Sequence, residues 1–80
     1  MNDLDAKIII ALAHNGLRAE PAARAIPMHR NSLVYHVKKI YKETGRNAFD
    51  YFDMGWLLPR AEAIMGKYGT FVLNGGARND

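Results

Sequence analysis

Pro27 is the residue that most limits how this chain can fold, because it separates two helical segments by a very short turn. It biases Ile26 toward an extended backbone and so ends a helix of good helix formers that begins near Pro21. Pro21 fits the first turn of that helix, where its missing N–H is not needed. Only residues 27–29 remain before a second helix begins. Residues 15–45 are therefore predicted to form two helices joined by a tight turn.

The second of these helices has a marked beginning and end. With His29 as the N-cap, Met28 and Leu33 occupy the two positions of a hydrophobic staple. The helix is expected over residues 30–44, and Gly45 supplies the left-handed residue on which helices commonly end. Helical periodicity places four residues on an inward stripe: Leu33, Val37, Ile40 and Thr44. The opposite side carries Asn31, Tyr35, Lys38 and Lys42. This arrangement is typical of a helix-turn-helix, whose second helix enters the major groove of DNA.

Positive charge is concentrated on the same region. Residues 17–46 carry two acidic side chains and seven basic ones, a local charge of +5: Arg18, Arg24, Arg30, Lys38, Lys39, Lys42 and Arg46. Residues 1–16 and residues 47–80 each sum to −1, which accounts for the net charge of +3. This distribution is the electrostatic pattern expected for contact with a phosphate backbone. Solvated surface helices have a similar composition, so the charge alone leaves both interpretations open.

The residues of this region also resemble those of a known family. The run over residues 23–40, ARAIPMHRNSLVYHVKKI, followed by Thr44 and Gly45, is similar to the C-terminal helix-turn-helix of PucR-like regulators, which activate purine-catabolism and sugar-diacid genes. The most specific part is HRNSL followed by a tyrosine. The similarity extends over about residues 5–64 and implies double-stranded DNA binding and transcriptional control. Val34 and His36 stand where the family often has arginine, and the family's sensor region has no counterpart in this sequence.

If the second helix docks in the usual way, its first residues reach base edges and its flanks reach phosphates. Arg30 and Asn31 are then the candidates for base reading, since Arg pairs with guanine and Asn with adenine. Asn31 would alternatively use its side chain at the helix start. Ser32 would donate to a phosphate or simply occupy the first turn.

Four further side chains complete the expected DNA-binding set. Tyr35 would contact a phosphate or a thymine methyl group, or else pack against Arg30 or Lys38. Three lysines are expected to neutralise phosphates without reading sequence: Lys38, Lys39 and Lys42. His29 and His36 lie seven residues apart without further ligands nearby, so no metal is expected, and nothing indicates a cofactor or a small-molecule ligand. His36 borders the inward stripe and is expected to be half-buried.

A helix is also predicted at the start of the chain. Asn2 or Asp3 can cap it, with Asp5 in its first turn, and it should end near His14. Ile9 and Ile10 widen its apolar surface beyond one narrow face. Another helix of the same chain is the favoured cover for that surface, with a dimer contact as the alternative.

The segment after Gly45 is predicted to open another helix, with Asp50 as its N-cap and Asp53 at the third position. Capping explains these two carboxylates better than acid–base chemistry, because no second catalytic group accompanies them. An apolar set should complete the core against the first helix: Trp56, Leu57, Leu58, Ala61, Ile64 and Met65. Pro59 is expected to kink this helix or break it near Leu58. Residues 70–73, TFVL, have a strand-like composition and are expected to pack or pair, and residues 74–80 to fray.

These observations predict an all-α fold, a small helical domain of about four helices with a central helix-turn-helix. Residues 1–66 would form the DNA-binding domain and residues 67–80 a C-terminal tail. The expected function is sequence-specific binding of double-stranded DNA in transcriptional regulation, as a homodimer, because one half-site usually gives too little affinity. The alternative is a protein-interaction module that buries Val34 and Tyr35 against a partner protein.

Enzymatic activity is not expected, because the chain has no catalytic constellation. The first five residues are acidic where a secretory signal would be basic, and no apolar run reaches the length of a membrane span. A cytoplasmic protein without membrane contact is therefore expected.

Overall fold

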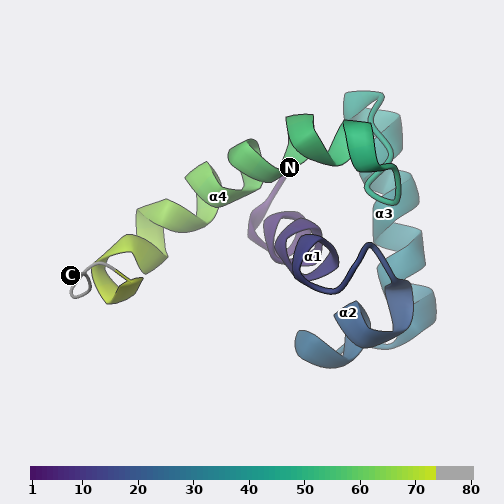
Figure 1. Cartoon of the computed structure of the whole chain (residues 1–80), viewed down its shortest axis with the longest axis horizontal. Coiled ribbons are helices and arrows are strands. Elements are labelled where there is room, and N and C mark those ends of the chain that lie inside the picture. Colours follow the sequence, from purple (N-terminus) through teal and green to yellow (C-terminus); the bar gives the residue numbers. More distant parts are fainter. Residues whose placement is uncertain (74–80) are drawn as a thin grey trace.

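The computed structural model describes the backbone of residues 1–73 and the side chains of residues 1–66. It has four helices in this part of the chain: α1 (Asp3–His14), α2 (Ala19–Ala25), α3 (Arg30–Thr44) and α4 (Tyr51–Leu73). Figure 1 shows α1 in the middle, with α2 and α3 on one side and α4 on the other. No strand occurs among these 73 residues. The predicted all-α fold of four helices with a central helix-turn-helix is confirmed.

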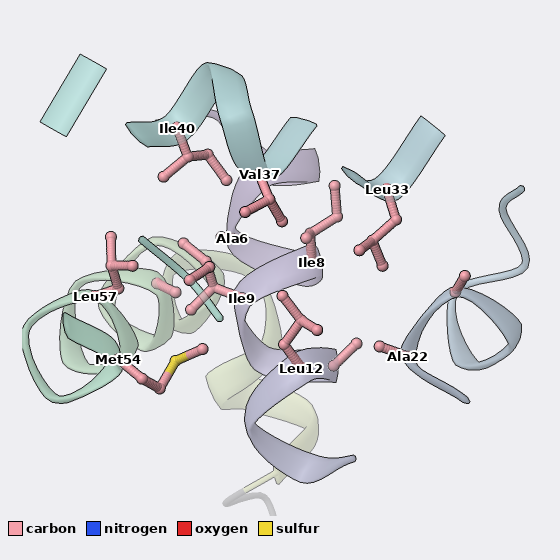
Figure 2. Packing of buried hydrophobic residues seen from close by; sticks show 14 residues of the cluster. Ala6, Ile8, Ile9, Leu12, Ala22, Leu33, Val37, Ile40, Met54 and Leu57 are labelled. Atoms are coloured by element: carbon pink, nitrogen blue, oxygen red, sulfur yellow. The ribbon is translucent and has the colours of Figure 1, made fainter. Parts of the chain in front are cut away.

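The core is built around α1, which contacts each of the other three helices. Ile8, Ile9 and Leu12 of α1 are fully buried. Figure 2 shows side chains of the other helices gathered about them: Ala22, Leu33, Val37, Ile40, Met54 and Leu57. Ile10 packs against this cluster while remaining partly exposed. The wide apolar surface of α1 is thus covered by a helix of the same chain, α4, as predicted.

The first turn of α1 is closed by a capping box. The side chain of Asn2 accepts a hydrogen bond from the Asp5 backbone N–H at 2.8 Å, and the Asp5 carboxylate accepts one from the Asn2 N–H at 3.1 Å. The helix ends at His14, as expected. Gly16 and Leu17 then take left-handed backbone conformations, with φ of 65° and 61°. The backbone of Leu17 is strained at this φ, because the left-handed region is unfavourable for a residue with a Cβ atom. The Leu17 N–H donates to the Leu12 carbonyl at 2.8 Å.

The two central helices lie close to their predicted bounds, although α2 begins at Ala19, before Pro21, and Ile26 has φ of −108° and ψ of 23° instead of the extended backbone expected before Pro27. Pro21 lies in the first turn of α2, and α2 ends before Ile26. His29 is the N-cap of α3, since its Nδ1 accepts from the Asn31 N–H at 3.3 Å. Gly45 ends α3 in the left-handed region with φ of 76°. The connection between the helices comprises residues 26–29.

The start of α4 is capped by carboxylates. The Asp50 side chain accepts from the Asp53 N–H at 2.9 Å, and Asp53 Oδ2 accepts from the Asn47 N–H at 2.9 Å. The capping interpretation is therefore confirmed for Asp50, whereas Asp53 lies in the first turn of α4 but bonds the connection that precedes the helix. Leu57 and Ala61 are fully buried, and the rest of the predicted apolar set of α4 packs around the core while partly exposed: Trp56, Leu58, Ile64 and Met65.

Of the two outcomes expected at Pro59, a kink or a break, the break does not occur, because α4 continues without interruption from Tyr51 to Leu73. Leu57 and Ala61, on either side of the proline, are both anchored in the core, while Pro59 and Gly55 are exposed. The Gly55 carbonyl that loses its partner can therefore bond water.

Residues 70–73 do not form a strand, although their composition is strand-like; their backbone is helical. Extending an existing helix by a residue is easier than starting a new element, which explains the outcome. Helix α4 thus crosses the expected boundary between residues 66 and 67. The expected fraying of residues 74–80 lies outside the described residues.

Candidate nucleic-acid interface

Helix α3 is held against the core by one narrow side. Leu33, Val37 and Ile40 are at most 3% exposed, as the periodicity predicted. Helix α2 lies beneath its first turns, where the small side chains of Ala22 and Ala23 are buried. The Met28 N–H donates to the Ala23 carbonyl at 2.8 Å and so closes the turn between the helices. The other side chains of α3 are exposed or partly exposed.

The first turn of α3 presents three polar side chains to solvent: Arg30, Asn31 and Ser32. The backbone N–H of Asn31 is bonded by the His29 ring, so the helix start does not require the Asn31 side chain. That side chain makes no hydrogen bond within the described residues, and Arg30 makes no ion pair there. All three groups are therefore available to a ligand.

The exposed face continues along the helix through Tyr35, Lys38 and Lys42. Tyr35 is 65% exposed and touches the ring of His36 edge-on, with centroids 5.5 Å apart. Lys38 and Lys42 are exposed and form no ion pair within residues 1–66. Six of the seven predicted residues are thus exposed along α3, and we call this exposed set the α3 outer face: Arg30, Asn31, Ser32, Tyr35, Lys38 and Lys42.

Lys39, the seventh predicted residue, is placed differently. Its ammonium group lies 3.0 Å from Asp5 Oδ2 and 3.6 Å from Glu43 Oε2. The hydrogen bond to Asp5 is the main cause that raises the pKa of Lys39 above its ordinary value of 10.5, partial desolvation opposes it, and Glu43 adds a smaller increase. Lys39 is thus engaged with α1 and with its own helix, and we leave it out of the α3 outer face.

The Asp5 carboxylate is the partner that sequence reasoning missed. It is fully buried, and besides capping α1 it binds Lys39 across 34 positions of sequence. Its other oxygen, Oδ1, lies 3.8 Å from Nδ1 of His36, and neither atom has a hydrogen-bond partner within the described residues. The sequence did contain a sign of this contact. Asp5 stands three, four and seven residues before Ile8, Ile9 and Leu12, so it lies on the same buried side of α1. An acid on that stripe required a cation from a facing helix.

A shallow hollow of about 560 Å³ borders the α3 outer face. Its lining joins α3 to the segment before α4: Val34, Val37, Lys38, Tyr41, Lys42, Asn47 and Phe49. Most of this lining is apolar, with Tyr41 55% exposed, and Lys38 and Lys42 are the charged residues in it. Asn47 and Phe49 were not predicted to lie beside α3. The surface around Lys38 and Lys42 is thereby continuous with the connection between α3 and α4.

Within the described residues, no three His, Asp or Glu side chains converge as a metal ion would require. Nor does any described helix combine the length and apolarity of a membrane span.

Comparison of the whole chain with known proteins gives no match to a family model, to a curated protein or to a solved structure.

Proposed function

We propose that this chain binds double-stranded DNA through the α3 outer face and acts in transcriptional regulation, as the PucR-like resemblance implies. The observation that carries the proposal is the arrangement of that face. A convex helix held on its far side by Leu33, Val37 and Ile40 presents two lysines and an arginine that form no ion pair with the side chains of residues 1–66. A helix of this exposure fits the major groove, and unpaired cations displace counterions from phosphates.

The two ends of the α3 outer face have different roles in this proposal. Arg30 and Asn31, in the first turn, read base edges, because the beginning of a recognition helix enters deepest. Tyr35 contacts a phosphate or a thymine methyl group from the middle of the face. Lys38 and Lys42 lie one and two turns further along and hold the phosphate backbone. Two copies of the chain would bind half-sites about one helical turn apart.

The test compares the salt dependence of binding in matched variants. Lys38→Ala combined with Lys42→Ala should lower the slope of log K against log salt by about 2, since each phosphate contact contributes about 0.9. Lys7→Ala removes one exposed lysine from α1 and should leave the slope unchanged. Binding is measured by fluorescence anisotropy against random duplexes over a range of salt concentrations. A double variant with the slope of Lys7→Ala would refute the proposal.

The hollow beside Val34 favours a second candidate, a module that docks a partner protein. Its mostly apolar lining and the exposed Tyr41 resemble the centre of a protein interface more than a surface for phosphates. In that case the wild-type chain would show no duplex binding even at low salt. Val34→Glu would abolish capture of the partner while the thermal unfolding midpoint stayed close to that of the wild type.

A further inference from the structure

Two arginines lie over the ring of the one tryptophan in the chain. The guanidinium carbon of Arg60 is 3.7 Å from the centroid of the Trp56 ring, and that of Arg46 is 4.9 Å away. Trp56 and Arg60 are one turn apart on α4, whereas Arg46 comes from the connection after Gly45. The left-handed Gly45 turns the chain at this point, and the Arg46 N–H donates to Thr44 Oγ1 at 3.0 Å. We call the set of Arg46, Trp56 and Arg60 the Arg–Trp cluster.

The Arg–Trp cluster carries more positive charge than its neighbours neutralise. Arg46 Nη1 lies 3.7 Å from Asp53 Oδ1, while the second oxygen of Asp53 is occupied by the Asn47 N–H. Arg60 donates from Nη1 to the Trp56 carbonyl at 2.8 Å and has no carboxylate within ion-pair distance among the described residues. Two guanidinium groups thus face one carboxylate. Among the described residues, the cluster therefore retains a positive charge and N–H groups without an acceptor.

Stacking on the indole also holds the arginines in place before any ligand arrives. A guanidinium lying over an aromatic ring has a restricted plane, so less side-chain freedom is lost when it binds. Its planar edge matches two oxygens of a phosphate, which a flexible ammonium group cannot do. The chemistry of the Arg–Trp cluster is therefore that of a preformed site for a phosphate group.

The position of the cluster relates it to the α3 outer face. Asn47, next to Arg46, lines the same hollow as Lys38 and Lys42. Asn47 is also tied to Asp53, the acid beside Arg46. A continuous surface therefore leads from the last turns of α3 to the Arg–Trp cluster.

We propose that the Arg–Trp cluster binds a backbone phosphate of the same DNA duplex, flanking the groove that α3 enters. This inference rests on the proposed DNA binding and extends the contact surface from α3 to α4. Arg60 and Arg46 add affinity without reading sequence, because phosphates are the same at every base pair. Trp56 serves to position the two guanidinium groups.

The experiment measures duplex binding of Arg60→Ala, Arg60→Lys and the control Lys7→Ala in the full chain. Arg60→Ala should lower the slope of log K against log salt by about 0.9, and weaken binding by the same factor for preferred and random duplexes. Arg60→Lys keeps the charge, so the slope should be retained while affinity falls, because the planar edge is lost. Thermal unfolding midpoints of all variants establish that each is folded at the assay temperature.

Trp56 provides a second readout, since its fluorescence reports changes in the groups stacked upon it. Duplex DNA should change the emission of the wild-type chain and leave that of Arg60→Ala much less affected. A slope for Arg60→Ala equal to that of Lys7→Ala would overturn this inference alone, provided the Lys38 and Lys42 variant still lowers the slope. Absence of duplex binding by the wild type would overturn both proposals. A saturable emission change with inorganic phosphate alone, as large as with duplex, would contradict the assignment to DNA.

Discussion

Lys38 and Lys39 are adjacent in sequence and identical in chemistry, yet they belong to two different sides of α3. Lys38 is exposed and makes no ion pair within residues 1–66, whereas Lys39 is bonded to the buried Asp5 of α1. The difference arises from the helical rotation of about 100° between successive residues. One turn of helix thus carries one cation exposed to solvent and one cation bonded within the fold. Counting basic residues along a helix therefore overestimates the charge that it offers to DNA.

The largest difference between the two sides should appear in stability. Ile40 is fully buried on the core side, whereas Tyr41, one residue further, is 55% exposed. Ile40→Ala should therefore lower the free energy of unfolding by about 3 kcal/mol. Tyr41→Ala should change it by less than about 0.5 kcal/mol, as is usual for surface substitutions. Urea denaturation followed by circular dichroism gives both values, and equal losses would mean that α3 is not held as described.

The link between Asp5 and α3 should have the next largest effect. The Asp5 carboxylate both caps α1 and binds Lys39. Asp5→Ala should therefore lower the free energy of unfolding by about 2 kcal/mol. A double-mutant cycle sharpens the comparison between the two lysines: Asp5→Ala and Lys39→Ala should be coupled, and Asp5→Ala and Lys38→Ala should be additive. Additivity in both cycles would show that the ion pair between Asp5 and Lys39 contributes nothing to stability.

The smallest expected effect is on the stability of the fold at alkaline pH. Because the pKa of Lys39 is raised in the folded protein, its contribution to stability is complete below 10.5 and is lost as the pH rises through the higher folded value. The wild type should therefore lose stability above pH 10.5 more steeply than Lys39→Met. Lys38→Met should follow the wild type, and the tyrosines, which all variants share, cancel in the comparison. Identical pH profiles for the wild type and Lys39→Met would contradict the assignment.

Local signals made most of the fold predictable. The cap at His29, the left-handed Gly45 and the inward stripe of α3 each depend on residues within a few positions of one another. The same holds for the carboxylates that begin α4. That the helix continues through Pro59 has another cause, since the neighbouring turns on both sides of the proline are anchored in the core. Such tertiary anchoring is not encoded in the local pattern.

The candidate site was predictable only in part, because its limits depend on contacts between distant residues. Four residues of the α3 outer face follow from periodicity, namely Asn31, Tyr35, Lys38 and Lys42, whereas Arg30 and Ser32 were predicted from the usual docking of such a helix. The placement of Lys39 required knowledge of Asp5, which lies 34 positions away. The Arg–Trp cluster was missed because Trp56 was assigned to the core from its apolarity, although its ring is also a surface for Arg46 and Arg60.

The Asp5 carboxylate has two roles, since it caps α1 and binds Lys39 of α3. The residues that orient α3 are therefore separate from those of the α3 outer face. One buried group starts α1 and holds Lys39 of α3, and no hydrogen bond or ion pair joins it to any of the six residues on the outer face. If α3 binds DNA as proposed, residues such as Arg30 and Asn31 can therefore be exchanged during evolution, which would alter the preferred DNA sequence, while the orientation of the helix is preserved. The residues that would set the preferred DNA sequence are then different from those that hold the fold, such as Asp5 and Lys39.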